Sequence, residues 1–176
     1  VLLVYGGLLG LLARLSPLRF FKGVAPALAV AFSTSSSAGT LPVSIECARK
    51  NLGVSQGVAG FVLPVGATIN MDGTAIYQGV LALFIAQAFG VDLNAGQYLM
   101  IILTATLASI GTAGVPGAGL IMLGLVLTSV GLPLEGVALI AGIDRILDMA
   151  RTTVNVSGDI LVSVLIARSE RELDLA

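Results

Sequence analysis

The sequence contains no histidine and a single cysteine, Cys47, and only 11% of its 176 residues are charged. The lack of histidine removes the most common general base and the most common metal ligand. A single cysteine excludes an internal disulfide and a cysteine-based metal cluster. The net charge of −1 gives no indication of nucleic-acid binding. Soluble globular domains carry about 25% charged residues, so the shortage of charge is instead typical of a membrane protein.

Hydrophobic residues make up 56% of the chain, and its mean hydropathy is +1.02. No Lys, Arg, Asp or Glu occurs in residues 51–71, 73–91 or 93–134. A helix of about 20 such residues can cross a bilayer, so we expect an all-α integral membrane protein. The chain does not begin with Met, shows no signal peptide and opens inside the apolar segment 1–12. We therefore expect a fragment of a longer, transporter-sized protein.

Two segments have the pattern of re-entrant helical hairpins. In residues 16–50, the hydroxyl-rich tip 33–37 separates two apolar halves of about ten residues, each about 15 Å long as a helix. In residues 94–131, the tip 111–119 contains four glycines and a proline between apolar halves. Half-length helices with polar tips are typical of chains that enter the membrane and return to the same side.

The remaining segments complete a repeated pattern. Residues 1–13 resemble the end of a membrane helix, and residues 55–90 form a helix that the polar stretch Asn70–Thr74 interrupts. A helix over 133–167 precedes the polar tail 168–176. Two interrupted hairpins in corresponding places, with broken transmembrane helices between them, predict an inverted-repeat transporter core.

The loop charges predict the orientation of this layout. If both hairpins return to their own side, one side of the membrane receives Arg14, Arg19, Lys22, Arg49, Lys50, Arg168 and Arg171. The opposite loops, around Asp92 and Glu135, hold no Lys or Arg. The positive-inside rule then predicts that the first hairpin enters from the cytoplasm and the second from outside.

The final helix carries a polar stripe. Five residues recur at spacings of four, three, four and four, which places them on one face of a helix: Asp144, Asp148, Arg151, Asn155 and Asp159. A charge at the centre of a bilayer costs roughly 2.5–3.5 kcal/mol. The stripe must therefore face a protected polar cavity.

Each polar group has a functional and a purely structural interpretation. Asn70, Asp72 and Thr74 offer the oxygen ligands that a hard cation such as sodium prefers, or Asp72 pairs with an arginine in a kinked helix. Asp159 either holds a cation or is solvated at the interface. Asp148 and Arg151 either form an ion pair with each other or bind the ammonium and carboxylate groups of a zwitterion.

Other functional classes fit less well. The hairpin tips offer helix N-termini that suit a carboxylate, whereas Ser-rich segments are often only linkers. A serine hydrolase would need a base near its nucleophile, and the chain has no histidine. We therefore do not expect an enzyme, and two hairpin gates around a charged pocket suit a carrier better than a channel.

Four segments together resemble the dicarboxylate/amino acid:cation symporter family, which includes archaeal aspartate, bacterial glutamate and animal excitatory amino-acid transporters. They are Ser35-Ser36-Ser37, Asn70-Met71-Asp72-Gly73-Thr74, residues 111–117 (GTAGVPG) and residues 148–159 (DMARTTVNVSGD). The resemblance implies the C-terminal half of such a transporter: the end of transmembrane helix 6 (1–13), hairpin 1 (16–50), helix 7 (55–90), hairpin 2 (94–131), helix 8 (133–167) and a cytoplasmic tail (168–176). The N-terminal helices and the trimerisation scaffold would lie outside it.

The resemblance implies roles for individual residues. Arg151 would bind the side-chain carboxylate of an acidic amino acid and Asp148 its α-amino group, and the rest of the pocket would comprise Ser36, Ser37, Thr74, Val115, Gly119, Thr152 and Asn155. One sodium ion would bind Asp144 and Asp159 with carbonyls of Gly66, Asn70 and Asn155. A second would bind backbone at Thr68, Ser109, Ile110 and Thr112, and a third would bind Asn70 and Asp72.

The resemblance further implies a multi-pass protein of the cell membrane, a homotrimer with no organic cofactor, that carries aspartate or glutamate with sodium. Hairpin 2 would be the external gate, and the transport domain would move along the scaffold. Ser35 stands where some archaeal members have Arg, and Arg145 would supply that charge. Gln78 replaces a glutamate of potassium-coupled animal members. A proton-coupled glutamate/aspartate symporter and a C4-dicarboxylate symporter remain alternatives.

Overall fold

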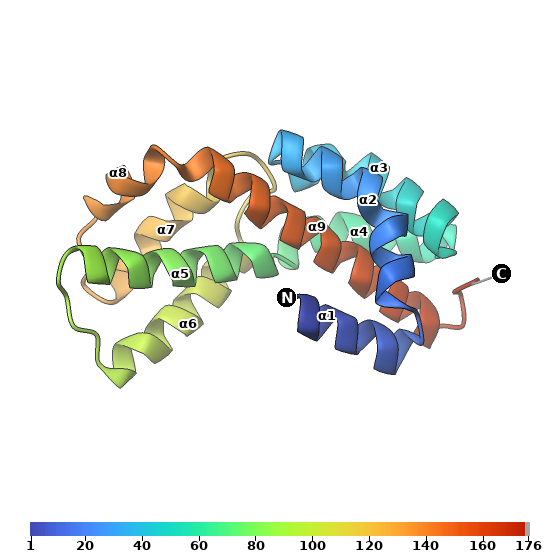
Figure 1. Cartoon of the computed structure of the whole chain (residues 1–176), viewed down its shortest axis with the longest axis horizontal. Coiled ribbons are helices and arrows are strands. Elements are labelled where there is room, and N and C mark those ends of the chain that lie inside the picture. Colours follow the sequence, from blue (N-terminus) through green and yellow to red (C-terminus); the bar gives the residue numbers. More distant parts are fainter. Residues whose placement is uncertain (175–176) are drawn as a thin grey trace.

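The computed structural model describes residues 1–174, and every regular element in that range is helical (Figure 1). The elements are α1 (Leu2–Leu8), the π-helical η1 (Leu9–Ala13), α2 (Pro17–Thr34), α3 (Ser37–Leu52), α4 (Gln56–Ile69), α5 (Asp72–Ala88), α6 (Ala95–Ile110), α7 (Ala118–Ser129), α8 (Gly136–Ala141) and α9 (Asp144–Ser169). The all-α prediction is therefore confirmed. An isolated antiparallel bridge between Val54 and Leu173 fastens the end of the described chain to the loop before α4.

Helix α9 packs against α2, α3, α4, α5, α8 and η1 and runs through both halves of the molecule (Figure 1). Its C-terminal half shares one apolar core with α1 to α4, and this core includes Phe20, Leu63 and Ile160. A second core is built by α5 to α8 and includes Ile85 and Leu127. Two apolar lobes thus meet along one helix, and the interruptions of the broken elements lie between the lobes.

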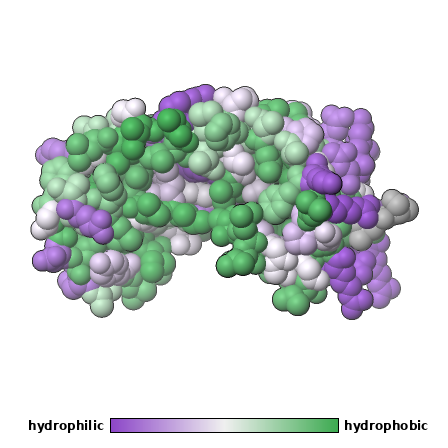
Figure 2. All heavy atoms as spheres, viewed as in Figure 1, coloured by the Kyte–Doolittle hydropathy of each residue, from purple (hydrophilic) through white to green (hydrophobic). Residues whose placement is uncertain are grey.

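Two helical segments are long and apolar enough to cross a membrane. Asp144–Ser169 is the continuous helix α9, and Gln56–Ala88 comprises α4 and α5 with the short break between them. The segment Leu2–Ala13 bends by 115° into Pro17–Thr34, which makes that pair a broken span or a re-entrant loop. Large apolar side chains such as Ile102 and Leu107 on α6 and Ile121 on α7 are exposed, and Figure 2 shows a largely hydrophobic surface over that lobe. These features establish an integral membrane protein, because such a surface is suited to lipid.

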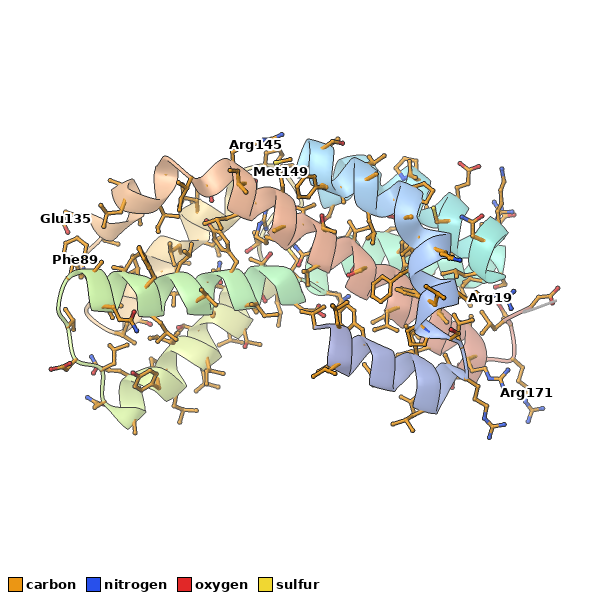
Figure 3. The ribbon with its side chains drawn as sticks, in the orientation of Figure 1. Arg19, Phe89, Glu135, Arg145, Met149 and Arg171 are labelled. Carbon is orange, nitrogen blue, oxygen red and sulfur yellow. The ribbon has the colours of Figure 1, made fainter. Side chains whose placement is uncertain are left out.

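The charged ends lie as the loop charges predict. Arg19 and Arg171 lie at one end of the molecule and Glu135 at the other (Figure 3). The hydrophilic surface in Figure 2 gathers at the end that carries Arg19. The basic end and the end without Lys or Arg therefore lie at opposite ends of the molecule's long axis.

The helices of hairpin 1 are longer than the ten-residue halves that the sequence suggested. Helix α2 has 18 residues and α3 has 16. Both extend beyond the apolar stretch, α2 back to Pro17 at its first turn and α3 forward to Leu52. There Gly53, with φ of 73°, ends the helix in the left-handed conformation that glycine adopts readily. Polar residues at the ends had hidden these extra turns.

The final helix is not continuous over 133–167, which corrects the sequence-based prediction. Helix α8 ends at Ala141, and α9 begins at Asp144 after Gly142 and Ile143. Glycine disfavours helix interiors by about 1 kcal/mol relative to alanine, and the side chain of Asp144 contacts α5 at this point. Helix α9 then extends to Ser169, two residues into the segment predicted as a polar tail.

Candidate functional site

The interruptions of three helical pairs converge on the middle of α9. Helices α2, α4 and α6 end there, and α3, α5 and α7 begin there (Figure 1). Helix N-termini carry partial positive charge and C-termini partial negative charge. The site therefore offers backbone donors for an anion and backbone carbonyls for a cation within one buried region.

The two hairpin tips contact each other directly. The Ser36 hydroxyl donates to the Gly114 carbonyl oxygen over 2.9 Å, and the Ala38 N–H donates to the same oxygen over 3.1 Å. Ser36 also caps α3 by accepting a hydrogen bond from the Gly39 N–H over 2.9 Å. A Cβ on Gly114 would lie 3.2 Å from both the Ala38 nitrogen and the Ala67 oxygen. This close approach of backbones explains the glycine in the second tip.

The centre of the site is an ion pair between Asp148 and Arg151, each at most 4% exposed. The Arg151 Nε donates to Asp148 Oδ1 over 2.7 Å, and its Nη2 donates to the same oxygen. The other carboxylate oxygen accepts the Gly117 N–H of hairpin 2 over 2.8 Å. The two charged groups that could bind a zwitterion therefore pair with each other, and Asp148 also binds the tip of hairpin 2.

Thr74 also binds Arg151, and Asn155 holds Thr74 in place. The Arg151 Nη1 donates to Thr74 Oγ1 over 2.8 Å, and Asn155 Nδ2 donates to the same oxygen over 3.0 Å. The Thr74 N–H in turn donates to Asn155 Oδ1 over 3.2 Å. Gly119 lies against the guanidinium, since a Cβ there would lie 3.2 Å from Arg151 Nε. Predicted pocket residues from α5, α7 and α9 thus lie together.

The other predicted pocket residues are placed as follows. Ser37 is buried at the first tip, next to Gly114 of the second. Thr152 is buried one turn along α9 from Asp148, and its hydroxyl has no hydrogen-bond partner among the described residues 1–174. Val115 is 47% exposed on the outer side of the second tip. The Arg145 Nη2 donates to the Ser33 carbonyl oxygen over 3.0 Å, so this cation does reach the tip of hairpin 1.

Tyr77 is a site residue that sequence reasoning missed. The Arg151 guanidinium carbon lies 6.0 Å from the centre of the Tyr77 ring, a cation–π distance. The Tyr77 hydroxyl donates to the Asp144 carboxylate. The available signal was its spacing, because Tyr77 follows Thr74 by three residues on α5 and so lies on the same helical face.

This contact also corrects the prediction that Asp144 and Asp159 share one sodium ion. Both residues belong to the unbroken helix α9, and 15 residues of helix separate them by about 22 Å. A single cation cannot contact both. At the start of α9, Asp144 instead accepts a hydrogen bond from Tyr77. The polar stripe therefore contributes to two separate sites along the helix.

A cluster of oxygen atoms surrounds Asp159 at the break between α4 and α5. Asn70 Nδ2 donates to Asp159 Oδ1 over 3.0 Å, and a Cβ on Gly66 would lie 2.8 Å from that oxygen. Asp72 lies close by, since a Cβ on Gly158 would lie 3.1 Å from Asp72 Oδ2 and 3.2 Å from Asn70 Nδ2. The structure thus brings together the carboxylates, the amide and the open end of α4.

Tyr5 of α1 also belongs to this cluster and was not predicted. Its hydroxyl donates to Asp72 Oδ2, and the ring is 5% exposed. The sequence placed Tyr5 in an apolar segment without indicating its partner. Tyr5 and Asp72 are 67 positions apart in the sequence, so no local pattern could reveal their contact.

The residues assigned to a second sodium ion lie at the ends of two helices. Thr68 is near the end of α4, and Ser109 and Thr112 are at the end of α6. Their hydroxyls donate to carbonyls of Val65, Thr106 and Ala108, each over 2.8 Å. Ile110 is half exposed. The chain brings the two ends near each other where Ala67 meets Gly114, so backbone carbonyls of both ends are close to one place where an ion could bind.

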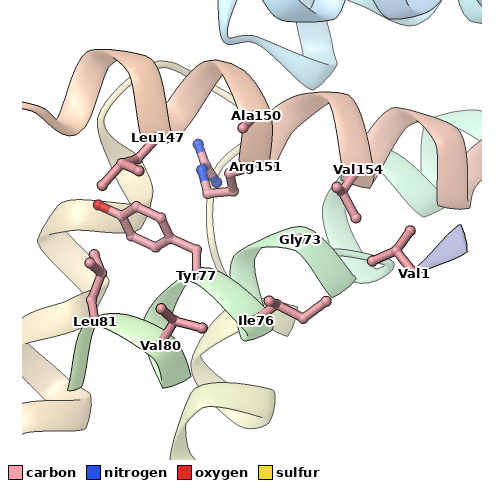
Figure 4. A pocket seen from close by; sticks show the side chains of 10 residues that line it. All are labelled: Val1, Gly73, Ile76, Tyr77, Val80, Leu81, Leu147, Ala150, Arg151 and Val154. Atoms are coloured by element: carbon pink, nitrogen blue, oxygen red, sulfur yellow. The ribbon is translucent and has the colours of Figure 1, made fainter. Parts of the chain in front are cut away.

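An apolar pocket of about 240 Å³ opens between α5 and α9 beside the site (Figure 4). Arg151 and Tyr77 line it together with Val1, Gly73, Ile76, Val80, Leu81, Leu147, Ala150 and Val154. Its walls lack the Asp148 and Thr74 groups that contact Arg151. The pocket is therefore the apolar back of the site and does not offer the pair of charges that a zwitterion needs.

Comparison with known proteins identifies the architecture. The family model described as "Sodium:dicarboxylate symporter family" matches residues 1–169. The chain belongs to this family. It is 49% identical over 179 residues to human excitatory amino acid transporter 2, covering 98% of this chain and 31% of that protein. It is 51% identical over 160 residues to an excitatory amino acid transporter of Caenorhabditis elegans, covering 90% and 32%.

Rat excitatory amino acid transporter 1 is 50% identical to the chain over 161 residues, covering 92% of the chain and 30% of the rat protein. The chain therefore spans about a third of the length of these relatives. The family membership confirms the resemblance seen in the motifs and identifies a transporter family, not an enzyme family.

Movement of hairpin 2 can be tested with two cysteines in a Cys47→Ala background of the full-length protein. Ala118 is 8% exposed at the start of α7, whereas Val115 is 47% exposed. If the tip lifts from Asp148 and Arg151, an external thiol reagent should label Ala118→Cys more slowly when aspartate and sodium, the ligands that the family resemblance implies, are added. A bulky competitive blocker should make the labelling faster. Val115→Cys, on the same tip, should change in the same direction but less, because its side chain is already 47% exposed. Ligand-independent labelling of Ala118→Cys would contradict a moving tip.

Proposed function

We propose that this chain forms the substrate- and ion-binding core of a secondary active transporter in the cell membrane. The transporter carries an acidic amino acid, aspartate or glutamate, together with sodium ions by an alternating-access movement of this core. The family description and the names of the relatives, excitatory amino acid transporters, support this function. A homotrimer formed through a scaffold outside residues 1–176 is part of the proposal.

The observation that carries the substrate assignment is the buried pair of Asp148 and Arg151 beneath the tip of hairpin 2. A substrate with both an ammonium and a second carboxylate can replace each internal partner. Arg151 then binds the side-chain carboxylate through its planar guanidinium, and Asp148 accepts the ammonium. The exchange leaves neither protein charge unpaired, which is the condition for keeping charges in a buried site.

The surroundings supply the remaining contacts for such a substrate. Thr74 and Asn155 already donate or accept hydrogen bonds next to the guanidinium. Thr152 has a buried hydroxyl available. The backbones at Ser36, Ser37, Val115 and Gly119 lie on the two tips, whose helix N-termini suit the α-carboxylate. The acidic amino acid is therefore enclosed by both hairpins, and its release requires one tip to move.

Sodium is the co-transported ion of the proposal. Sodium prefers several oxygen ligands, including backbone carbonyls. Asp159, Asn70 and Asn155 with the carbonyl of Gly66 form one set, and Asp72 with Asn70 forms part of another. The carbonyls at Thr68, Ser109, Ile110 and Thr112 form a third set. Asp144 is left out, because its partner is Tyr77.

The alternatives within the family differ in the charges they need. A C4-dicarboxylate has no ammonium, so it would leave Asp148 with a neighbouring negative charge instead of a partner. Proton coupling would need a carboxyl group that is protonated in transport, whereas the family description names sodium as the coupled ion. Both observations favour sodium-coupled transport of an amino acid.

The role of Arg151 can be tested with Arg151→Cys in the full-length protein reconstituted in proteoliposomes. Removal of one partner of a buried charge pair costs about 2–5 kcal/mol, so aspartate affinity should fall by at least about 30-fold. A neutral amino acid such as serine should still be taken up, which shows that the variant is folded. Arg168→Cys, at an exposed position of the same helix, should leave aspartate uptake unchanged. Unchanged aspartate affinity in Arg151→Cys would rule out the role.

Asp159→Asn tests the ion sites, because it keeps the shape of the side chain and removes its charge. We expect a higher sodium concentration to be needed for half-maximal aspartate binding, with part of the affinity restored at saturating sodium. Asp92→Asn, in an exposed loop, should behave like the parent protein. A loss of aspartate affinity that is equal at every sodium concentration would show that Asp159 contacts the substrate or only supports the fold.

A further inference from the structure

The basic end of the molecule contains a pocket that the transport site does not use. It lies at the sharp bend between η1 and α2, where the segments Leu2–Ala13 and Pro17–Thr34 form an angle of 115°. The pocket has a volume of about 580 Å³ and is lined by Ser16, Leu18, Arg19, Lys22, Gly23 and Asn51. Two cationic side chains, a hydroxyl and an amide thus surround one cavity at the membrane edge.

The walls of this pocket are held in place by close helix packing. Asn51 Nδ2 donates to the Gly23 carbonyl oxygen over 2.6 Å, which ties the end of α3 to α2. A Cβ on Gly23 would lie 2.8 Å from Leu52 Cδ2, so no larger residue fits there without movement. Arg19 and Lys22 are three residues apart on α2 and therefore project from the same face. This packing fixes the floor of the pocket, which is an open depression in the surface.

The charge around the pocket is positive. Seven of the nine basic residues lie at this end: Arg14, Arg19, Lys22, Arg49, Lys50, Arg168 and Arg171. The acidic residues there are Glu46, Glu170, Glu172 and Asp174. Glu46 is already paired with Lys50 over 2.7 Å, and Glu172 accepts a hydrogen bond from Ser55. Lys22 is exposed and makes no hydrogen bond or ion pair within residues 1–174. An anion is the ligand that this charge favours.

Apolar side chains adjoin the basic pocket. Leu18 lines it and is 65% exposed, and Leu11 and Leu12 on η1 are 82% and 59% exposed on the other side of the bend. Exposed leucines beside cations are typical of the membrane interface, where acyl chains and headgroups meet. A soluble anion would use the charges but not this apolar surface.

We propose that the pocket binds the phosphate headgroup of an anionic phospholipid, with Lys22 and Arg19 contacting the phosphate and an acyl chain lying along Leu18. Basic pockets at the ends of membrane helices bind such headgroups, and each nearby Lys or Arg contributes about 1 kcal/mol. The site is separate from Asp148 and Arg151 and belongs to the basic side of the membrane.

The experiment compares full-length wild-type protein with Lys22→Gln, Lys22→Arg and Lys50→Gln in detergent. Lys50→Gln is the matched control, because it removes the same charge at the same end from a lysine that is paired with Glu46. The apparent melting temperature is followed while dioctanoyl phosphatidylglycerol, dioctanoyl phosphatidylcholine or inorganic phosphate is added.

Phosphatidylglycerol should raise the melting temperature saturably in the wild type, in Lys50→Gln and in Lys22→Arg. In Lys22→Gln the midpoint concentration should rise about fivefold, and phosphatidylcholine should have a much smaller effect on every variant. Equal shifts in Lys22→Gln and Lys50→Gln would overturn the proposal, because they would show attraction to the basic end without a site. Equal stabilisation by phosphatidylcholine would overturn it too. Inorganic phosphate as effective as the lipid would contradict a lipid site.

Discussion

The buried ion pair between Asp148 and Arg151 is the interaction on which the rest of the site depends. Two charges in an apolar protein are tolerable only when each has a partner and additional hydrogen bonds. Here the extra hydrogen bonds come from two elements, Gly117 of hairpin 2 and Thr74 of α5, and the Tyr77 ring of α5 adds a cation–π contact with Arg151. Any change that separates the two charges must supply replacements, and an acidic amino acid carries the required pair of opposite charges.

The broken helices make this exchange possible. Backbone groups at helix ends have no intrahelical partners, and three pairs of ends meet at the middle of α9. The ends of α4 and α6 present carbonyls, and the starts of α3 and α7 present N–H groups. In the proposed function, the cation and the anion therefore bind within one network, where Asn155 contacts Thr74 next to Arg151 and lies one helical turn from Asp159. This arrangement gives a physical basis for coupling an ion to a substrate.

Much of the architecture could be predicted from local sequence patterns. The breaks at Asn70–Met71 and in residues 111–117 lie where glycine, proline or a charge interrupts an apolar run, and the stripe on α9 follows from its helical spacing. The predicted halves of hairpin 1 were too short, because polar residues continue α2 and α3 beyond the apolar stretch. The break before Asp144 was not predicted, because it coincides with a tertiary contact. Tyr5 and Tyr77 were missed because their partners, Asp72 and Asp144, are each 67 residues away. The assignment of Asp144 and Asp159 to one sodium ion, which the family resemblance implied, was wrong because 15 residues of unbroken helix separate them by about 22 Å.

In the proposed function, Asp148 and Arg151 each bind one charged group of the same substrate. Calorimetric titration of the full-length protein with aspartate and with succinate, at saturating sodium, tests it most directly. The two ligands share both carboxylates and differ in the ammonium group. We expect aspartate to bind at least about 30-fold more tightly, because succinate leaves Asp148 without its cationic partner in a buried site. Equal affinity for the two ligands would show that Asp148 does not bind the ammonium group.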